Sequence, residues 1–484
     1  MLFFVLIHFI WALLQGLRFI YIFQIKEYRF DRLQSIAKEI GYLRFLYTTS
    51  LKIPKVSLRN ILLVFFLTLG VSALFLYSFE QKYLFEFLGY SFFLAPLASF
   101  GIVSCGVFLT NIPSTILRSR IRYRAIQKVK KTKAVFIGIT GSYGKTSIKE
   151  YLAQILSIRF NVVKTPKNMN TDVGIALSIN RLLTKSTEFF ITELGAYRSG
   201  ELNYAASYIP FQYIILSGLG NQHLDLYGSK KALIQEEMSP VLHLPDSGTA
   251  YLNYESITEN AIDVSKFNTV TFGTSPHADI HLTDVKVTPE GTIGIMHYKN
   301  RLFQINTRLL GTHSLENLLP AVAISFDLGL NPRVIEKQIS KMQPLIGKLS
   351  KHKGRNNATI LHDGVNSNFN GFLAAIDVMK LFPQSKKIIM TQGIIELGVE
   401  KRSTYEQILH KMNNSGIKLF TTDIVFTTIK NNITIFTFND VESIQKNILQ
   451  SLDSNTLLLI EGAFAQPIID TFIIHLDHQN RSRK

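Results

Sequence analysis

Cysteine is nearly absent from the sequence: Cys105 is the one cysteine among 484 residues. One cysteine excludes an intramolecular disulfide framework and an intramolecular zinc cluster of cysteines. Glycine and proline, at 29 and 14 residues, are not enriched, which excludes a fibrous repeat and a disordered low-complexity chain. The sequence therefore indicates a folded protein with its polar part in a reducing compartment. Its length leaves room for a membrane section and two or three domains.

Acidic residues are scarce where basic residues gather. The chain has a net charge of +17. Residues 26–59 contain eight Lys or Arg and three acids, and residues 113–133 contain eight Lys or Arg and no acid, so the two stretches supply thirteen of the seventeen charges. Basicity spread over a folded surface would indicate nucleic acid, but these stretches flank apolar runs. We expect an anionic lipid surface as the partner, and no nucleic acid.

Three apolar runs, at about residues 2–23, 61–79 and 87–109, are each close to the ~20 residues that cross a bilayer as a helix. Runs that are apolar all round leave no wet face, which disfavours the alternative of buried helices in a soluble core. The first run lacks a basic start and a small-residue cleavage site, so we expect no cleaved signal peptide. The positive-inside rule predicts a cytoplasmic remainder and an outer N-terminus, hence a multi-pass protein of the cell membrane.

From Ala134 onward, strand-like and helix-like segments alternate, which is typical of an α/β fold with a mostly parallel sheet. A second series begins near Ala358. We expect a membrane region over 1–112 with three transmembrane helices, a basic cytoplasmic connector over 113–133, a central domain over 134–345 and a C-terminal Rossmann-like α/β domain over 346–484. The predicted elements are strands at 134–140, 189–194, 213–216, 387–390, 424–426 and 456–460, and a helix at 146–156.

The first predicted strand runs into a glycine-rich loop and then a helix-like segment, the arrangement that binds nucleotide phosphates. Backbone N–H groups can converge on phosphate oxygens there, Lys145 reaches the β- and γ-phosphates, and Thr146 ligates Mg²⁺. The strict spacing would place glycine at position 139, where the chain has Ile139. A bare turn is the alternative, but the strand before and the helix after favour a nucleotide. The candidate residues are Thr140, Gly141, Ser142, Tyr143, Gly144, Lys145, Thr146 and Ser147.

The loop form Thr-Gly-x-x-Gly-Lys-Thr, with separately spaced motifs over about 134–465, resembles the Mur ligase family, and within it the D-alanyl-D-alanine-adding, MurF-type members. The departure at Ile139 is typical of that family. Asn168 and Asn170 lie in a segment similar to the family's Asn-rich segment near the γ-phosphate. A polar turn before a helix is the alternative, because Asn is an ordinary turn residue.

Two more motifs supply metal ligands by resemblance. Glu193 ends a strand similar to the family's Glu-Leu-Gly-Ala, where a hard carboxylate suits Mg²⁺; a solvated strand end is the alternative. His223 lies in a segment similar to His-Leu-x-x-x-Gly-Ser and would help bind a second metal, although a lone loop histidine is more often a surface or capping residue. Fourteen residues later, Glu237 replaces a lysine that the family carbamylates, so its carboxylate would bridge the metals. Neighbouring Glu236 leaves the register open, and a solvated helix face is the alternative.

Later motifs resemble those of the family with substitutions. Asn317 is retained in a segment associated with adenine recognition, where Ser314 replaces an asparagine. Lys348 stands at the hinge where the family has arginine, and Asp363 would contact the ribose. The family's Lys-Gly-Ser-Arg is replaced by the segment Glu461–Phe464. Because two cations are lost there, the incoming amine and the acceptor stay open.

The resemblance implies a bacterial ATP-dependent ligase, in which a substrate carboxylate forms an acyl phosphate that an amine converts to an amide. The implied catalytic residues are Lys145, Glu193, His223 and Glu237, and the implied cofactors are ATP and Mg²⁺. The implied partners are a peptidoglycan-precursor-like carboxylate acceptor, an amino acid or dipeptide amine, and the lipid bilayer, since apolar helices stand in place of the family's UDP-sugar-binding domain. The alternatives are another Mur-fold ligase with a lipid-linked or polyglutamate-type acceptor, and a non-catalytic membrane nucleotide sensor.

Overall fold

The computed structural model describes residues 2–26, 28–47, 53–80, 84–196, 199–220, 227, 229–364, 367–394, 397 and 400–474. His223 and most of its motif lie outside the described residues. The chain divides into two compact units, Met1–Ile121 and Arg122–Lys484. Each unit is described by itself.

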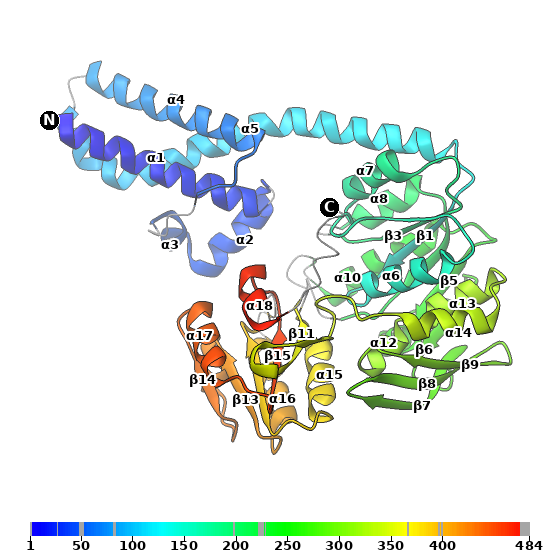
Figure 1. Cartoon of the computed structure of the whole chain (residues 1–484). Helices are drawn as coiled ribbons and strands as arrows, with labels where there is room; N and C mark the ends of the chain where they lie inside the picture. Colours follow the sequence, from blue (N-terminus) through cyan, green and yellow to red (C-terminus); the bar gives the residue numbers. More distant parts are fainter. Residues whose placement is uncertain are drawn as a thin grey trace. The chain divides into compact units, whose positions relative to one another are not determined.

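The first unit is helical (Figure 1). Within the described residues, three helices are long and apolar enough to cross a membrane, over Leu6–Ile25, Leu58–Tyr77 and Phe93–Val129. The three predicted apolar runs fall within α1, α4 and α5, and α5 continues into the predicted connector. The helices are α1 (Leu2–Ile25), α2 (Phe30–Ile40), α3 (Tyr42–Tyr47), α4 (Leu58–Glu80) and α5 (Leu84–Val129), the last of which extends into the second unit.

Glycines set the closest approach between the apolar helices. A Cβ atom on Gly16 of α1 would lie 2.3 Å from the side chain of Leu67 on α4. A Cβ atom on Gly106 of α5 would lie 3.0 Å from the side chain of Leu63, also on α4. Small residues allow apolar helices to pack closely where burial from water does not drive them together.

The charged side chain of Arg18 in α1 has its hydrogen-bond partners within this unit. Arg18 is buried and donates hydrogen bonds to the side chain of Gln15 at 2.9 Å and to the carbonyl oxygen of Leu46 at 3.0 Å. It also donates to the carbonyl oxygen of Phe45. The guanidinium therefore caps the end of α3, where helix carbonyls lack intrahelical partners.

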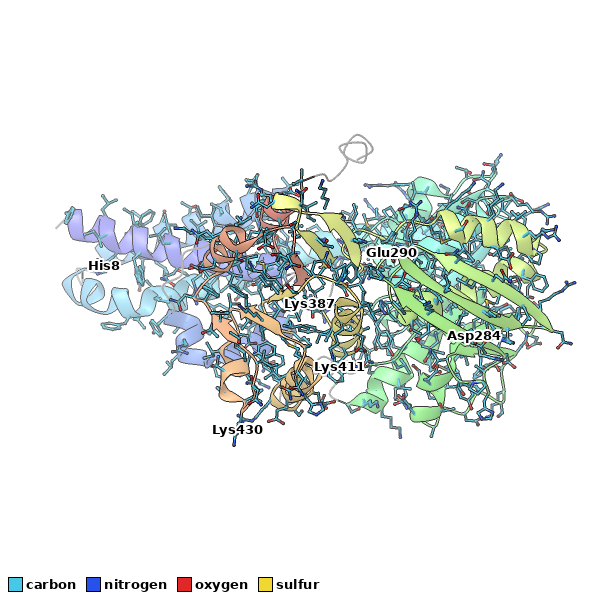
Figure 2. The ribbon with its side chains drawn as sticks, turned by 60° about the horizontal axis from the view of Figure 1, so that its bottom comes forward. His8, Asp284, Glu290, Lys387, Lys411 and Lys430 are labelled. Atoms are coloured by element: carbon cyan, nitrogen blue, oxygen red, sulfur yellow. The ribbon has the colours of Figure 1, made fainter. Side chains whose placement is uncertain are left out.

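The described strands of the second unit form two sheets (Figure 1). The first has nine strands in the order β2-β3-β1-β4-β5-β6-β7-β8-β9. Neighbours from β2 to β7 pair in parallel, and β7, β8 and β9 pair antiparallel. Figure 2 marks Asp284 on β7 and Glu290 at the turn into β8. The strands are β1 (Val135–Thr140), β2 (Val162–Lys164), β3 (Phe189–Glu193), β4 (Phe211–Leu216), β5 (Thr249–Asn253), β6 (Thr269–Gly273), β7 (Ile280–Thr288), β8 (Gly291–Tyr298) and β9 (Arg301–Thr307).

The central strands of this sheet are nearly continuous apolar runs, as parallel strands covered on both faces usually are. Every residue of β3 is buried. Ile139 of β1 pairs in register with Glu193 of β3, which brings the ends of both strands to one edge of the sheet. The helices of this part are α6 (Lys145–Leu156), α7 (Asp172–Leu182), α8 (Glu201–Tyr208), α10 (Lys230–Met238), α11 (Tyr254–Glu259), α12 (Thr312–Glu316), α13 (Leu319–Asp327) and α14 (Pro332–Lys341).

The end of α5 is fastened to α7 by polar contacts within the second unit. Arg122 forms an ion pair with Asp172 at 2.6 Å. Lys128 donates a hydrogen bond to the carbonyl oxygen of Asn180 at 2.9 Å. The basic connector is therefore joined to the first sheet domain by side chains as well as by the backbone.

The second sheet has the order β10-β11-β15-β12-β13-β14, and all pairs except β10–β11 are parallel. Side chains of β15 alternate between two cores. Leu457 and Leu459 pack with residues of α15 and α16, and Leu458 and Ile460 pack with residues of α17 and α18. The elements are β10 (Ser350–Lys353), β11 (Thr359–Asp363), β12 (Lys386–Thr391), β13 (Ile417–Thr421), β14 (Ile435–Thr437), β15 (Thr456–Glu461), α15 (Phe369–Lys380), α16 (Lys401–Met412), α17 (Val441–Ser451) and α18 (Gln466–Phe472).

The predicted fold class is confirmed, since two mostly parallel α/β sheets follow the apolar helices. One predicted strand is wrong, because residues 424–426 belong to the 3₁₀ helix Ile424–Thr428. Asp423 accepts a hydrogen bond from the backbone N–H of Val425 at 3.1 Å, which closes a turn. Phe426 then stacks on Tyr405 of α16 with ring centroids 3.8 Å apart. A short apolar run can reach the core from a turn as well as from a strand.

Candidate nucleotide-binding site

The loop between β1 and α6 requires glycine at two positions. Gly141 has φ +117° and Gly144 has φ +85°, in the region that disfavours other residues. A Cβ atom on Gly141 would lie 2.2 Å from the side-chain oxygen of Ser217, and one on Gly144 would lie 2.4 Å from the side-chain oxygen of Asn317. Asn317, predicted to recognise adenine, thus packs against the loop itself.

The N-terminus of α6 is the anion-binding part of the loop. Gly144 is its N-cap residue and supplies no side-chain cap. The first-turn N–H groups therefore lack intrahelical acceptors, which is the feature that lets a helix N-terminus bind an anion. The N–H groups of Ser142 and Tyr143 instead donate to the carbonyl oxygen of Gly218, at 2.9 and 3.3 Å. Lys145 donates its side-chain hydrogen bond to the carbonyl oxygen of Gly141. The ammonium group therefore lies over the loop.

Thr146 and Glu193 form the candidate Mg²⁺ site. The Thr146 hydroxyl donates to Glu193 Oε2 at 2.8 Å. Glu193 is only 5% exposed, so its alternative as a solvated strand end is wrong. Two adjacent hard oxygen donors fit Mg²⁺, which keeps several waters and takes few protein ligands. Among the described residues, no three His, Cys, Asp or Glu side chains gather to hold a metal.

Lys149 is a site residue that the sequence analysis missed. Its ammonium nitrogen lies 3.7 Å from Glu193 Oε2 and donates to the carbonyl oxygen of Thr165 at 3.0 Å. The side chain is fully buried. Its spacing of four from Lys145 places both lysines on one side of α6. This spacing is the sequence feature that could have indicated Lys149 as a site residue. Lys149 holds the Glu193 carboxylate in place from behind the site.

Glu237 is tied to the loop, and Glu236 is not. Glu237 Oε2 accepts a hydrogen bond from the Gly141 N–H at 2.7 Å and another from the Thr140 hydroxyl. Glu236 accepts from the N–H groups of Gly200 and Leu202, at 2.6 and 2.8 Å, and so caps α8. Burial raises the pKa of Glu236, while these two N–H groups lower it.

Both glutamates are buried, so the alternative of a solvated helix face is wrong. Of the two glutamates, Glu237 is the one whose carboxylate contacts the loop. Metal bridging by Glu237 stays a prediction, since His223 lies outside the described residues.

The Asn-rich segment is a turn that ends beside the site. Asn168 has φ +64°, as turn asparagines often do. The carbonyl oxygen of Asn170 accepts from the Gly195 N–H at 2.9 Å. A Cβ atom on Gly195 would lie 2.8 Å from the amide nitrogen of Asn170. Asn170 therefore lies beside Gly195, which follows β3 two residues beyond Glu193.

Charged residues of the second sheet also act on the site. Burial lowers the pKa of Lys348, and the charges of Asp363 and Glu193 raise it. Burial raises the pKa of Asp363 to about 6, while Lys348 lowers it. Carboxylates of both sheets thus act on the pKa of Lys348. A hinge residue between two domains is expected to show this.

A second link joins the loop to α15. Burial raises the pKa of the Tyr143 hydroxyl, and the nearby side chain of Asn370 lowers it. The ring of Tyr143 lies against Gly218, where a Cβ atom would come within 2.0 Å of it. No motif indicated Asn370, because this contact depends on how two distant segments fold together.

Comparison with known proteins shows what the chain is similar to. Residues 139–325 match the Mur ligase middle domain. The MurF ligase from Thermotoga maritima in complex with ADP superposes with a TM-score of 0.66 at 22% identity, covering 73% of this chain and 82% of that one. MurF from Acinetobacter baumannii gives 0.64 at 20% identity, covering 72% and 77%. Residues 139–325 are thus similar to the Mur ligase middle domain, and the chain has the fold of a Mur ligase.

Within that class, the curated relatives are of MurF type, as the motifs predicted. UDP-N-acetylmuramoyl-tripeptide–D-alanyl-D-alanine ligase of Escherichia coli is 26% identical over 296 residues, which cover 60% of this chain and 64% of the relative. The Bacillus subtilis ligase of the same name is 27% identical over 294 residues, covering 60% and 62%. The chain thus spans a little under two thirds of the length of these relatives.

Proposed function

We propose that the protein is an ATP-dependent amide-forming ligase of the MurF type, acting in peptidoglycan-precursor synthesis. The observation that carries this proposal is the hydrogen bond from Thr146 to Glu193 beside Lys145, at the N-terminus of α6. This grouping supports Mg²⁺ and the phosphates of ATP at one point. The name of the E. coli relative suggests a UDP-N-acetylmuramoyl-tripeptide as acceptor and D-alanyl-D-alanine as amine.

The proposed reaction joins groups that do not condense at neutral pH, because hydroxide is a poor leaving group. A carboxylate oxygen of the acceptor attacks the γ-phosphorus, the bond to ADP breaks, and an acyl phosphate forms. The amine nitrogen then attacks the carbonyl carbon and loses a proton, and phosphate leaves. This chemistry needs no side-chain nucleophile; it needs positioning and the neutralisation of charge.

The residues divide this work between them. Lys145 and the first-turn N–H groups of α6 bind phosphate oxygens and offset their charge. Thr146 and Glu193 would hold Mg²⁺, with Glu237 and His223 as further candidate ligands. Bound Mg²⁺ would neutralise the transferring phosphoryl group. Lys149 keeps the Glu193 carboxylate oriented from the buried side.

We also propose that the ligase works at the cytoplasmic face of a membrane. In the described part of the chain, three helices long and apolar enough to cross it precede the Mur-type domains. The basic end of α5 suits an anionic lipid surface. An acceptor confined near the bilayer would meet the site at a raised effective concentration. A lipid-linked acceptor is the corresponding variant of the proposal.

A non-catalytic nucleotide sensor is the second candidate. The observation that favours it is the segment Glu461–Phe464, which replaces two cations of the related motif. A sensor would bind nucleotide at the same loop without acceptor-dependent turnover. The two candidates therefore differ in whether the acceptor changes ADP release.

The test uses the full chain in detergent with ATP, Mg²⁺, UDP-N-acetylmuramoyl-tripeptide and D-alanyl-D-alanine. A ligase releases ADP only when both substrates are present, and Lys145→Ala abolishes that release. Lys337→Ala, at an exposed lysine on α14, is the matched control and should behave as wild type. ADP release that ignores the acceptor, or survives Lys145→Ala, would reject the proposal.

A further inference from the structure

Two carboxylates lie side by side at the end of the second sheet. Asp363 is the last residue of β11 and Glu461 the last of β15, and the two are paired in register on these parallel strands. The Gly462 N–H donates to the carbonyl oxygen of Asp363 at 2.9 Å, which fixes the two strand ends together. In-register side chains on neighbouring strands point to the same face, so the two acids face each other at close range.

Glu461 is incompletely satisfied. The Ser367 hydroxyl donates to its Oε1 atom at 2.6 Å. Its Oε2 atom is buried and has no hydrogen-bond partner among the described residues. The side chain is only 1% exposed, so bulk water does not supply the missing donor. An unmade hydrogen bond to a buried carboxylate is unfavourable, which indicates that a donor is missing from this place.

The charge of the cluster depends on the proton state of its two acids. Burial and the neighbouring Asp363 raise the pKa of Glu461, and Lys348 acts on both acids as a cation. When both carboxyl groups are ionised, two carboxylates with one ammonium leave one negative charge. A divalent cation would overcompensate this charge and would face Lys348. A monovalent cation that donates hydrogen bonds, such as an organic ammonium, balances both the charge and the unpartnered oxygen.

The position of the cluster suits a substrate. Ligands of open α/β sheets bind at the carboxyl ends of the strands, and Asp363 and Glu461 are at those ends. Lys348 also feels the charges of Glu193 and Lys145, so the cluster neighbours the phosphate site. A nitrogen held here is therefore near the group that an amine must attack, and it becomes a nucleophile once its ammonium group passes one proton to a carboxylate of the pair.

We propose that Glu461, with Asp363, binds the ammonium group of the incoming amine substrate and so selects for a cationic amine. This inference rests on the proposed ligase function, since it names the group that the ligase recognises. Glu461 is then a specificity residue, and Ser367 positions its carboxylate. The competing account is a carboxyl pair that shares a proton and binds nothing.

The first test needs no turnover and uses methylammonium as the probe, with the full chain in detergent. Saturation-transfer NMR should show methylammonium binding to the wild type, and Glu461→Gln should abolish the signal. Glu442→Gln removes a charge from an exposed residue of the same domain and should bind as wild type does. A signal that is absent from the wild type, or equal in Glu461→Gln, would overturn the inference and favour the proton-sharing pair.

The second test separates this inference from the ligase proposal. Hydroxylamine, uncharged at neutral pH, traps an acyl phosphate as a hydroxamate, so its product with the wild type and UDP-N-acetylmuramoyl-tripeptide supports the ligase alone. With D-alanyl-D-alanine, Glu461→Gln should raise the KM for the amine roughly ten-fold or more, with the KM for ATP little changed. Glu461→Asp should restore part of the difference. Hydroxamate formation together with an unchanged amine KM would contradict the ammonium site and leave the ligase standing.

Discussion

The hydroxyl of Thr146 donates a hydrogen bond of 2.8 Å to Glu193, although the two residues belong to different elements. Thr146 is the second residue of α6, directly after Lys145, and Glu193 ends the strand next to β1. The contact therefore joins the phosphate-binding end of α6 to a carboxylate at the edge of the sheet.

Gly144→Ala should disable the loop. The new methyl group would sit 2.4 Å from the Asn317 side-chain oxygen, and a left-handed Ala costs about 1–2 kcal/mol by itself. Gly416 has φ +66° and nothing within 4 Å of an added Cβ atom, so Gly416→Ala is the matched control with strain but no clash. Both variants should lose stability in chemical denaturation, and only Gly144→Ala should lose ATP-dependent turnover. Equal turnover in the two variants would speak against the role of the loop.

Glu237→Gln should weaken the Mg²⁺ dependence of turnover strongly, because it removes the charge that Thr140 and Gly141 hold at the loop. Turnover of the wild type should be indifferent to bicarbonate depletion, since a glutamate needs no CO₂. Glu236→Gln is the control: it should lower stability by about 1 kcal/mol through the cap of α8 and leave the Mg²⁺ midpoint in place. A Glu237→Gln enzyme with a normal Mg²⁺ titration would end the bridging hypothesis.

The pH dependence of stability should change when Asp363 is replaced. Burial raises its pKa to about 6 from 3.8, so between these values the folded state binds the proton more tightly than the unfolded state. This group therefore stabilises the fold at low pH, and that contribution is lost as pH rises toward 6. Asp363→Asn should show a gain in unfolding free energy over the wild type that grows from pH 4 to pH 6.5. A difference between the two proteins that is constant over this range would refute the buried, proton-binding state of Asp363.

The apolar helices should make the protein integral to a membrane. Membranes washed with alkaline carbonate should retain the full chain, because α1, α4 and α5 can each cross the bilayer. In a Cys105→Ser background, a cysteine at Glu80 should react with an impermeant reagent from outside, and one at Lys133 should not. Release into the wash, or labelling of position 133 from outside, would disprove the predicted topology.

Much of the site could be predicted because its signals are local. The loop, Glu193 and the strand before α6 are read from short segments whose chemistry depends on their own residues. Lys149 was missed because a lysine four residues along a helix is usually solvated, and only the fold shows that its ammonium group lies against Glu193. The strand at 424–426 was wrong because its apolar residues reach the core from a turn closed by Asp423.

Other features could not be predicted from the sequence, because they depend on contacts between distant segments. Asp363 and Glu461 become neighbours only because β15 inserts between β11 and β12, and nothing near either residue indicates that strand order. The contact of Tyr143 with Asn370 likewise depends on the packing of distant segments. The division between Glu236 and Glu237 needed the positions of α8 and the loop, since the two residues are chemically equal in the sequence.

Isotope transfer from the acceptor tests the central claim most directly. The acceptor carboxylate is labelled with ¹⁸O, and the phosphate released during turnover with ATP and D-alanyl-D-alanine is analysed by mass spectrometry. If the carboxylate oxygen attacks the γ-phosphorus, one labelled oxygen leaves with each phosphate, because the C–O bond breaks when the amine attacks. Phosphate without label, formed at the same rate as ADP, would show that water rather than the carboxylate is the phosphoryl acceptor and would contradict the ligase account.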